Sequence, residues 1–150
     1  MKPFRFTLQR LLDLREGAEN DARAAVAQIR RIVAEAQAEV ERLQQERSRW
    51  LHTDAFTSVH GDVERFERTN LTAWIVELEH RIHAQQEYLQ TAREQENQAL
   101  AVLLERSRER KKVEKLKGRQ WEEFKKEQTR QAGRELDEVA IRAYQGRSTA

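Results

Sequence analysis

The sequence predicts an all-α protein: two long helices forming an antiparallel coiled-coil hairpin, with the second helix overhanging at the open end. The only proline is Pro3 and glycines number five, so residues that interrupt a helix are rare after the N-terminus. In both halves of the chain the apolar residues recur at steps of three and four, the spacing of a coiled-coil seam. One central segment, residues 52–61, is rich in the Thr, Ser, Asp and Gly that favour turns.

The composition separates this fold from globular and disordered alternatives. Hydrophobic residues make up 38% of the chain and charged residues 36%, whereas a globular domain of ordinary composition is about 45–50% apolar. This balance leaves either disorder or helices with a narrow apolar stripe. Because the apolar residues are periodic, we expect one helical coiled-coil domain spanning residues 1–150.

The first helix is expected at about residues 5–54. Its seam contains two consecutive steps of four, at Ile32, Ala36 and Val40, which predict a stutter that locally unwinds the supercoil. The expected seam positions are Leu8, Leu11, Arg15, Ala18, Ala22, Ala25, Ile29, Ile32, Ala36, Val40, Leu43, Arg47 and Trp50.

The turn is expected at about residues 55–62 and the second helix at about 63–145. Asp62 suits the N-cap of that helix, because its carboxylate can accept hydrogen bonds from the first free backbone amides. The expected seam positions are Leu71, Ile75, Leu78, Ile82, Gln85, Leu89, Ala92, Glu96, Ala99, Leu103, Arg106, Arg110, Val113, Lys117, Gln120 and Phe124.

The two arms are unequal in length. If the turn centres near Gly61, Phe6 pairs with Val113 or Glu114, and roughly 30 later residues, or about 45 Å of helix, have no partner within the chain. A helix is stabilised mainly by packing of its apolar face, so this overhang predicts contact with another molecule. Its apolar residues are Leu116, Trp121, Phe124, Leu136, Val139, Ile141 and Tyr144.

Positive charge is concentrated in the same region. From residue 105 onward, 14 Lys and Arg stand against 9 Asp and Glu. Solvated helix charge, a protein partner and nucleic acid are the three interpretations, and Glu109 and Glu114 within residues 106–117 weaken the last one. Arg106 and Arg110 fall at seam positions, where burial of a charge is costly, so the hairpin is expected to loosen or meet solvent there.

Catalytic, metal and cofactor sites are not expected. Two helices cannot form a desolvated pocket of converging groups, and the sequence has no Gly-rich phosphate loop and no cysteine. His80 and His83 beside Glu79 have a spacing compatible with a metal ion but lack further ligands; His52 and His60 are interpreted as turn residues. With neither a secretory signal nor an apolar membrane span, we expect a soluble, cytoplasmic protein.

The tryptophans differ in their expected roles. Trp50 lies on the first seam and is expected to pack in the core or to contact a partner. Trp74 lies one position off the second seam, and Trp121 lies in the overhang. An exposed tryptophan on a helix is commonly a contact residue, so the interaction sites are expected at both ends of the hairpin.

Both ends of the chain resemble the FliJ family of bacterial flagellar export proteins. The opening, Phe4-x-Phe6-x-Leu8-x-x-Leu11-Leu12-x-Leu14-Arg15, is similar to the start of that family. The segments Arg119-Gln-Trp-Glu-Glu-Phe-Lys-Lys-Glu and Glu135-Leu-Asp-Glu-Val-Ala-Ile-Arg are similar to its C-terminal part. Total length, unequal arms and turn position also agree.

The resemblance implies a non-enzymatic part of the flagellar type III export apparatus, which serves flagellum biogenesis, protein transport, motility and chemotaxis. FliJ proteins resemble the central stalk of rotary ATPases. The open end would enter the pore of the hexameric export ATPase, FliI, and the end near the turn would reach the export gate protein, FlhA. The family also handles export chaperones, and it would associate peripherally with the cytoplasmic face of the membrane through the apparatus.

The resemblance assigns residues to two surfaces. Those expected to contact the ATPase are Phe4, Phe6, Leu8, Leu11, Arg15, Leu116, Arg119, Gln120, Trp121, Phe124, Leu136, Asp137 and Glu138. Those expected to contact the gate are Trp50, Trp74 and Leu78. The alternatives are a stalk protein of the injectisome type III system and a general coiled-coil scaffold or substrate chaperone that dimerises through the overhang. Binding of nucleic acid through residues 105–134 is a further alternative that we do not favour.

Overall fold

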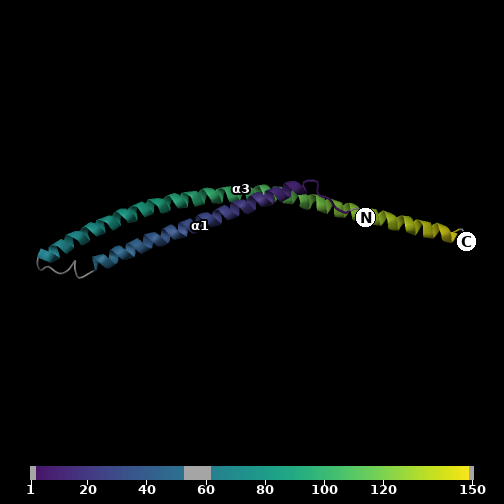
Figure 1. The fold of residues 1–150 in the computed structure, drawn as a ribbon. Helices are drawn as coiled ribbons and strands as arrows, with labels where there is room; N and C mark the ends of the chain where they lie inside the picture. Colours follow the sequence, from purple (N-terminus) through teal and green to yellow (C-terminus); the bar gives the residue numbers. More distant parts are fainter. Residues whose placement is uncertain (1–2, 53–61, 149–150) are drawn as a thin grey trace. The chain divides into compact units, whose positions relative to one another are not determined.

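The computed structural model describes residues 3–52 and 62–148, whose regular structure is entirely α-helical. Helix α1 comprises the 43 residues Gln9–Leu51, and α3 comprises the 87 residues Asp62–Ser148 (Figure 1). The all-α prediction is confirmed, and the two helices pack against each other. The expected turn, about residues 55–62, lies outside the described residues except for Asp62, where α3 begins.

The segment before α1 is not helical. Residues 3–6 have no regular structure and residues 7–8 form a turn, so α1 begins later than residue 5. The backbone N–H of Gln9 donates to the carbonyl of Phe6 over 3.1 Å, and that of Leu12 donates to the carbonyl of Leu8 over 3.0 Å. Phe4 and Phe6 are thereby free to leave the helical path and reach α3.

The chain divides into two structural units, and each contains part of α1 and part of α3. One unit comprises Asp21–Leu104, and the other comprises Met1–Asn20 together with Glu105–Ala150. We refer to them as the central unit and the terminal unit.

The central unit has an aliphatic core between the helices. One cluster joins Leu43 of α1 to Leu78 and Ile82 of α3, and a second joins Ala36 and Val40 to Leu89. Burying such side chains provides about 25 cal/mol per Å² of apolar surface. This row of aliphatic contacts holds the unit together.

Polar contacts across the central unit fix the direction of the helices. Arg30 pairs with Glu96 over 3.0 Å, and Arg93 donates to Gln37 over 2.9 Å. Later residues of α1 thus meet earlier residues of α3. The two segments of this unit run antiparallel.

The seam of α1 is more regular than expected, and the predicted stutter is absent. Val26 is buried whereas Ala25 is exposed, and Glu19 is buried whereas Ala18 is only half-buried. The prediction was wrong because it chose Ala18, Ala25 and Ile32 where the neighbouring residue, one position later, continues the seam. All the buried positions of α1, together with three half-buried ones, follow alternating steps of three and four: Leu12, Arg15, Glu19, Ala22, Val26, Ile29, Val33, Ala36, Val40 and Leu43.

The seam of α3 agrees with the prediction. Leu71, Ile75, Leu78, Ile82, Leu89 and Ala92 are buried. From Gln85 to Phe124 the other expected positions are half-buried, apart from Arg106, which is exposed. The spacing alone was sufficient here because large aliphatic side chains mark the first half of this seam.

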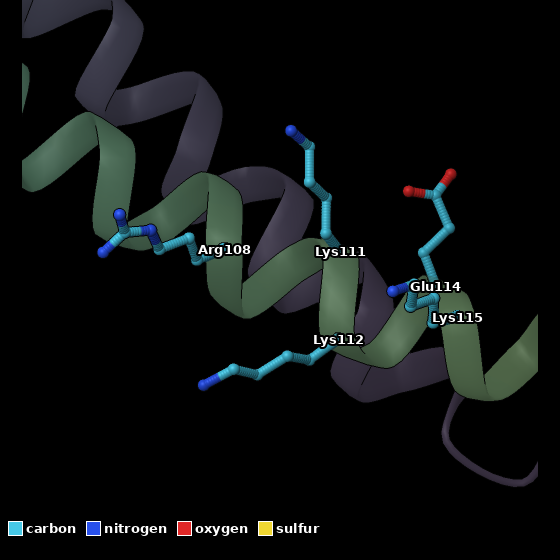
Figure 2. Close-up of a pocket in the computed structure, with 5 residues that line it drawn as sticks. All are labelled: Arg108, Lys111, Lys112, Glu114 and Lys115. Atoms are coloured by element: carbon cyan, nitrogen blue, oxygen red, sulfur yellow. The ribbon is translucent and has the colours of Figure 1, made fainter.

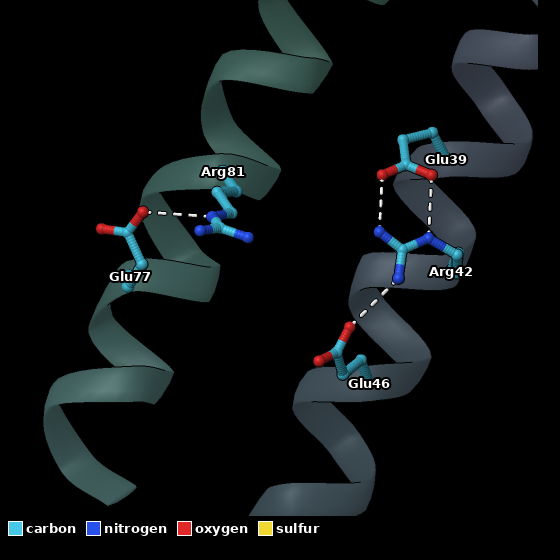
Figure 3. Close-up of polar contacts among 5 residues, drawn as sticks. All are labelled: Glu39, Arg42, Glu46, Glu77 and Arg81. Carbon is cyan, nitrogen blue, oxygen red and sulfur yellow. Dashed lines mark hydrogen bonds and ion pairs between the residues drawn. The ribbon is translucent and has the colours of Figure 1, made fainter. Parts of the chain in front are cut away.

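The outer faces carry charged pairs within each helix (Figure 3). Arg42 contacts Glu39 over 2.7 Å and Glu46 over 3.2 Å, and Arg81 contacts Glu77 over 3.1 Å. The hydrogen bonds from Arg42 hold the pKa of the Glu39 carboxyl below its usual value. Such exposed pairs three or four residues apart support a helix only weakly, so they keep the helices soluble more than they hold them together.

We expect Leu78→Ala to lower the free energy of unfolding by about 2–5 kcal/mol, because a large buried side chain is replaced and leaves a cavity. Leu78 is 0% exposed, whereas Leu104, on the same helix and in the same unit, is 54% exposed. Leu104→Ala is therefore the matched control and should cost little. Urea unfolding followed by circular dichroism measures both, and equal losses would contradict the assignment of the core.

Candidate functional site

The residues that the resemblance assigns to the ATPase all lie in the terminal unit, which combines Met1–Asn20 with Glu105–Ala150. Within it, Phe4 from the irregular N-terminal segment packs on two aromatic rings of α3. The Phe4 ring centroid lies 5.1 Å from that of Trp121 and 5.5 Å from that of Phe124. Trp121 and Phe124 stack on each other at 5.7 Å. We call these three residues the aromatic cluster.

Lysine side chains extend the aromatic cluster. The Lys125 ammonium lies 5.4 Å from the Trp121 ring centroid, and the Lys117 ammonium lies 5.9 Å from that of Phe6. Lys117 also donates a hydrogen bond of 2.7 Å to the side-chain oxygen of Gln9. A cation over a ring is attracted by its quadrupole, so Lys117 ties the start of the chain to α3, while Lys125 supports Trp121 within α3.

These contacts correct the expected pairing of the two helices. Phe6 lies beside Lys117, about one helical turn beyond the expected Val113 or Glu114. Trp121 and Phe124, which were expected to have no partner within the chain, are partly covered by Phe4. The prediction was wrong about the register of the whole seam, since Leu43 with Ile82 and Arg30 with Glu96 are shifted from the expected pairing by a similar amount.

Charged residues occupy the seam of the terminal unit. Glu19 is only 3% exposed and pairs with Arg110, which also contacts Glu114 over 2.5 Å. Arg15 pairs with Glu109 over 2.6 Å. We call Arg15, Glu19, Glu109 and Arg110 the charged seam.

The charged seam replaces the loosening that we expected near Arg110. A buried charge is tolerated when a partner and hydrogen bonds compensate it, and Glu19 supplies that partner. Its hydrogen bond is the main cause of the raised pKa of the Arg110 guanidinium. In the described part of the chain, no buried side-chain nitrogen or oxygen lacks a hydrogen-bond partner.

The C-terminal stretch of α3 has a different surface. Its four large apolar side chains are 57–78% exposed: Leu136, Val139, Ile141 and Tyr144. Asp137 is also exposed, and Glu138 pairs with Arg142 over 3.6 Å. This stretch exposes more large apolar side chains than a helix that faces only solvent is expected to expose.

The other residues assigned to the ATPase lie between these features. Leu8 and Leu116 are each 38% exposed, and Arg119 is exposed. Leu11 and Gln120 are half-buried. The structure thus brings Phe4, Trp121 and Phe124 into contact, whereas Leu136, Asp137 and Glu138 lie farther along α3.

The residues assigned to the gate lie in the central unit and differ in exposure. Trp50 is exposed, so packing in the core is not its role. Trp74 is half-buried against the Leu43 cluster, with the Arg81 guanidinium 5.2 Å from its ring centroid. Leu78 is fully buried, so its side chain supports Trp74 from within and is not presented to a partner.

Three of the four histidines, His52, His80 and His83, lie among the described residues. His83 lies 3.6 Å from Glu87, and the His52 ring lies 2.7 Å from the carbonyl of Ser48; His60 lies outside the described residues. Within residues 3–52 and 62–148, no three side chains form a group that could hold a metal ion. Neither helix of the described chain contains a stretch long and apolar enough to cross a membrane.

Sequence reasoning missed Glu19 and Lys125 as contact residues, and it placed Lys117 on the seam without its contact to Phe6. For Glu19 the signal was available, since it completes the alternating spacing between Arg15 and Ala22. The contact between Lys117 and Phe6 depends on the path of the N-terminal segment, which no periodic pattern marks, whereas Lys125 and Trp121 are four residues apart on α3.

Comparison with known proteins identifies one family. The family model described as "Flagellar FliJ protein" matches residues 4–149, which is nearly the whole chain. Neither the curated proteins nor the solved structures give a significant match.

We expect Phe4→Ala to expose Trp121. In a Trp50→Phe/Trp74→Phe background, Trp121 is the only tryptophan, and its emission maximum should move to longer wavelength. Loss of two aromatic pairs should also cost about 1–3 kcal/mol of stability. The control is Phe66→Ala, because Phe66 is exposed on α3 in the central unit. An unchanged spectrum for Phe4→Ala would contradict the aromatic cluster.

The charged seam predicts a coupling between Glu19 and Arg110. Glu19→Leu and Arg110→Leu should each lower the thermal midpoint, because each leaves one charge in the seam without its partner. The double variant should recover most of that loss, since two leucines can pack at these positions. Additive losses in thermal unfolding would show that the two side chains do not interact.

Proposed function

The chain belongs to the FliJ family of flagellar export-apparatus components, and from this membership we propose that it is the stalk and coupling protein of the flagellar export ATPase. It would form an antiparallel hairpin whose α3 overhangs at the open end, enter the pore of the hexameric ATPase by that end, and link ATP turnover to the export gate. The family is one of export proteins and not a known enzyme family. The ATPase would supply the chemistry and this chain the contacts that direct it.

One observation carries this proposal: the start of the chain and α3 meet at a surface that still has apolar side chains to bury. The aromatic cluster leaves Trp121 40% exposed, and the large apolar residues after it are more exposed still. Exposed aromatic and aliphatic side chains on a soluble helix are typical of a binding surface. A ring that closes around α3 would bury them.

The mechanism follows from a mismatch in symmetry. Two helices of unequal length present different side chains in every direction, whereas a hexameric ring presents six copies of one surface. Each subunit would therefore contact a different part of the terminal unit and be favoured in a different state. A ligand shifts a conformational equilibrium only through such differential contacts.

The central unit would serve the export gate. Trp50 is exposed, and Trp74 presents part of its ring with Arg81 beside it. We propose that these two tryptophans contact the gate protein and that buried Leu78 holds Trp74 in place. Export chaperones are further proposed partners, and the protein would act in the cytoplasm at the membrane face that carries the apparatus. No nucleic-acid partner is proposed.

The exposed stretch of α3 also favours a second candidate. A coiled-coil scaffold that dimerises through Leu136 and Val139 would bury the same side chains. Analytical ultracentrifugation separates the two, because such a scaffold would be dimeric without any ATPase. A stalk of the injectisome system would differ only in which ATPase it stimulates.

We expect the protein to raise the ATPase rate of its cognate flagellar export ATPase. The variant Leu136→Ser/Val139→Ser should require about tenfold more protein for half-maximal stimulation, because two contact side chains are lost. Its matched control is Val102→Ser/Leu104→Ser, which removes the same residue types at 52% and 54% exposure on the same helix.

Trp121→Ala and Phe124→Ala test the aromatic cluster in the same assay. Both should weaken stimulation while the helical content by circular dichroism stays unchanged. If wild-type protein neither stimulates the ATPase nor migrates with the hexamer, the proposal of a stalk is wrong, and a coiled-coil scaffold becomes the better explanation.

A further inference from the structure

One face of α3 in the terminal unit carries a row of cationic side chains that the proposed function does not use. Arg108, Lys111, Lys112 and Lys115 are exposed and line a shallow surface pocket together with Glu114 (Figure 2). Residues three or four apart are neighbours on a helix surface, so these side chains form one patch. Arg119 continues the spacing after Lys115. We call these five cations the basic face; it extends about 16 Å along the helix.

Two of the nearby carboxylates pair with cations that do not belong to the basic face. Glu109 pairs with Arg15 and Arg106, and Glu114 pairs with Arg110 over 2.5 Å. Glu105 lies 3.9 Å from Arg108, at the limit of an ion pair. Among the residues that the structure describes, Lys111, Lys112, Lys115 and Arg119 form no ion pair.

This arrangement separates the charges of one helical segment. Glu109 is drawn toward α1 by Arg15, and Glu114 is engaged by Arg110 on α3 itself, whereas the lysines remain exposed. Like charges at this spacing destabilise a helix, and exposed lysines bury no surface in return. Neutral helix-forming residues at these positions would therefore stabilise the helix better than the cations of the basic face do.

We propose that the basic face is an electrostatic docking site for an acidic protein surface, namely carboxylates that line the pore of the ATPase hexamer. This inference rests on the proposed function and extends it to the chemistry of the partner. Carboxylates spaced along a loop or helix of each subunit would meet lysines spaced at one helical turn. Complementary charge of this kind mainly speeds association and orients the partner.

Two observations favour protein over the other anionic partners. The basic face leads along α3 into Trp121 and Phe124, so it is continuous with the surface proposed to enter the pore. Glu105, Glu114 and Glu122 flank the row of cations, and they would repel the closely spaced phosphates of a nucleic acid or of a lipid surface. A protein can match such a mixed pattern with cations of its own.

The test compares two triple variants of equal charge in the export ATPase assay. Lys111→Gln/Lys112→Gln/Lys115→Gln neutralises the centre of the basic face and keeps good helix formers. Arg31→Gln/Arg65→Gln/Arg68→Gln removes the same charge from exposed positions in the central unit, which is not proposed to contact the ATPase. Stimulation is titrated from about 50 to 300 mM KCl, a range over which screening by salt increases strongly.

The lysine variant should need about five- to tenfold more protein for half-maximal stimulation at low salt, which corresponds to three exposed ion pairs. Its maximal stimulation should be unchanged and its salt dependence much weaker than that of the wild type. The arginine variant should behave like the wild type, and both should keep wild-type helical content by circular dichroism.

Two outcomes would overturn the inference without affecting the proposed function. One is stimulation by the lysine variant that matches the wild type at every salt concentration. The other is an unchanged stimulation combined with lysine-dependent co-sedimentation with phosphatidylglycerol vesicles, or lysine-dependent binding to double-stranded DNA. If the wild type itself fails to stimulate the ATPase, the proposed function falls and the identity of the docking partner falls with it.

Discussion

The narrow stripe of side chains between α1 and α3 is the constraint on which the structure depends. A chain with 36% charged residues can bury only one side chain every three to four positions of each helix. In the central unit that stripe is aliphatic and includes the fully buried Leu78. Because so little surface is buried per turn, many turns are needed to bury enough apolar surface. Each local break in the stripe therefore weakens the packing of the two helices.

The terminal unit fills the same stripe with different chemistry. Glu19 and Arg110 occupy seam positions as a pair, and the aromatic cluster closes the interface at the start of the chain. A seam of ion pairs costs desolvation and provides little net stability, but it requires the correct partner on the opposite helix. The charged seam therefore specifies how the two segments of this unit align, while the aliphatic core of the central unit provides most of the stability.

This division bears directly on function. The proposed ATPase surface lies in the unit that has the smaller apolar core and the larger exposed apolar surface. Arg15 and Arg110 engage Glu109 and Glu114, and the lysines of the basic face remain exposed. One pattern of charge can thus serve two purposes, alignment within the protein and attraction of a partner, because one side of α3 faces α1 and the other is exposed to a partner.

The amino-acid sequence by itself determined the two long helices, their approximate extent and the seam of α3. Helix propensity and the spacing of apolar residues are local properties, so they can be read without knowing what lies opposite. It also determined the family, since the motifs at both ends of the chain are carried by consecutive residues.

Only the tertiary structure decided the rest, because those features depend on pairs of residues that are distant in the sequence. A glutamate at position 19 is acceptable in the seam only when Arg110 faces it, so composition alone moved the expected seam to Ala18 and introduced a stutter. The irregular path of residues 3–6 places Phe4 on Trp121 and Phe124, and no helical period could predict it. The charge of the basic face depends in the same way on the ion pairs that engage its neighbours Glu109 and Glu114.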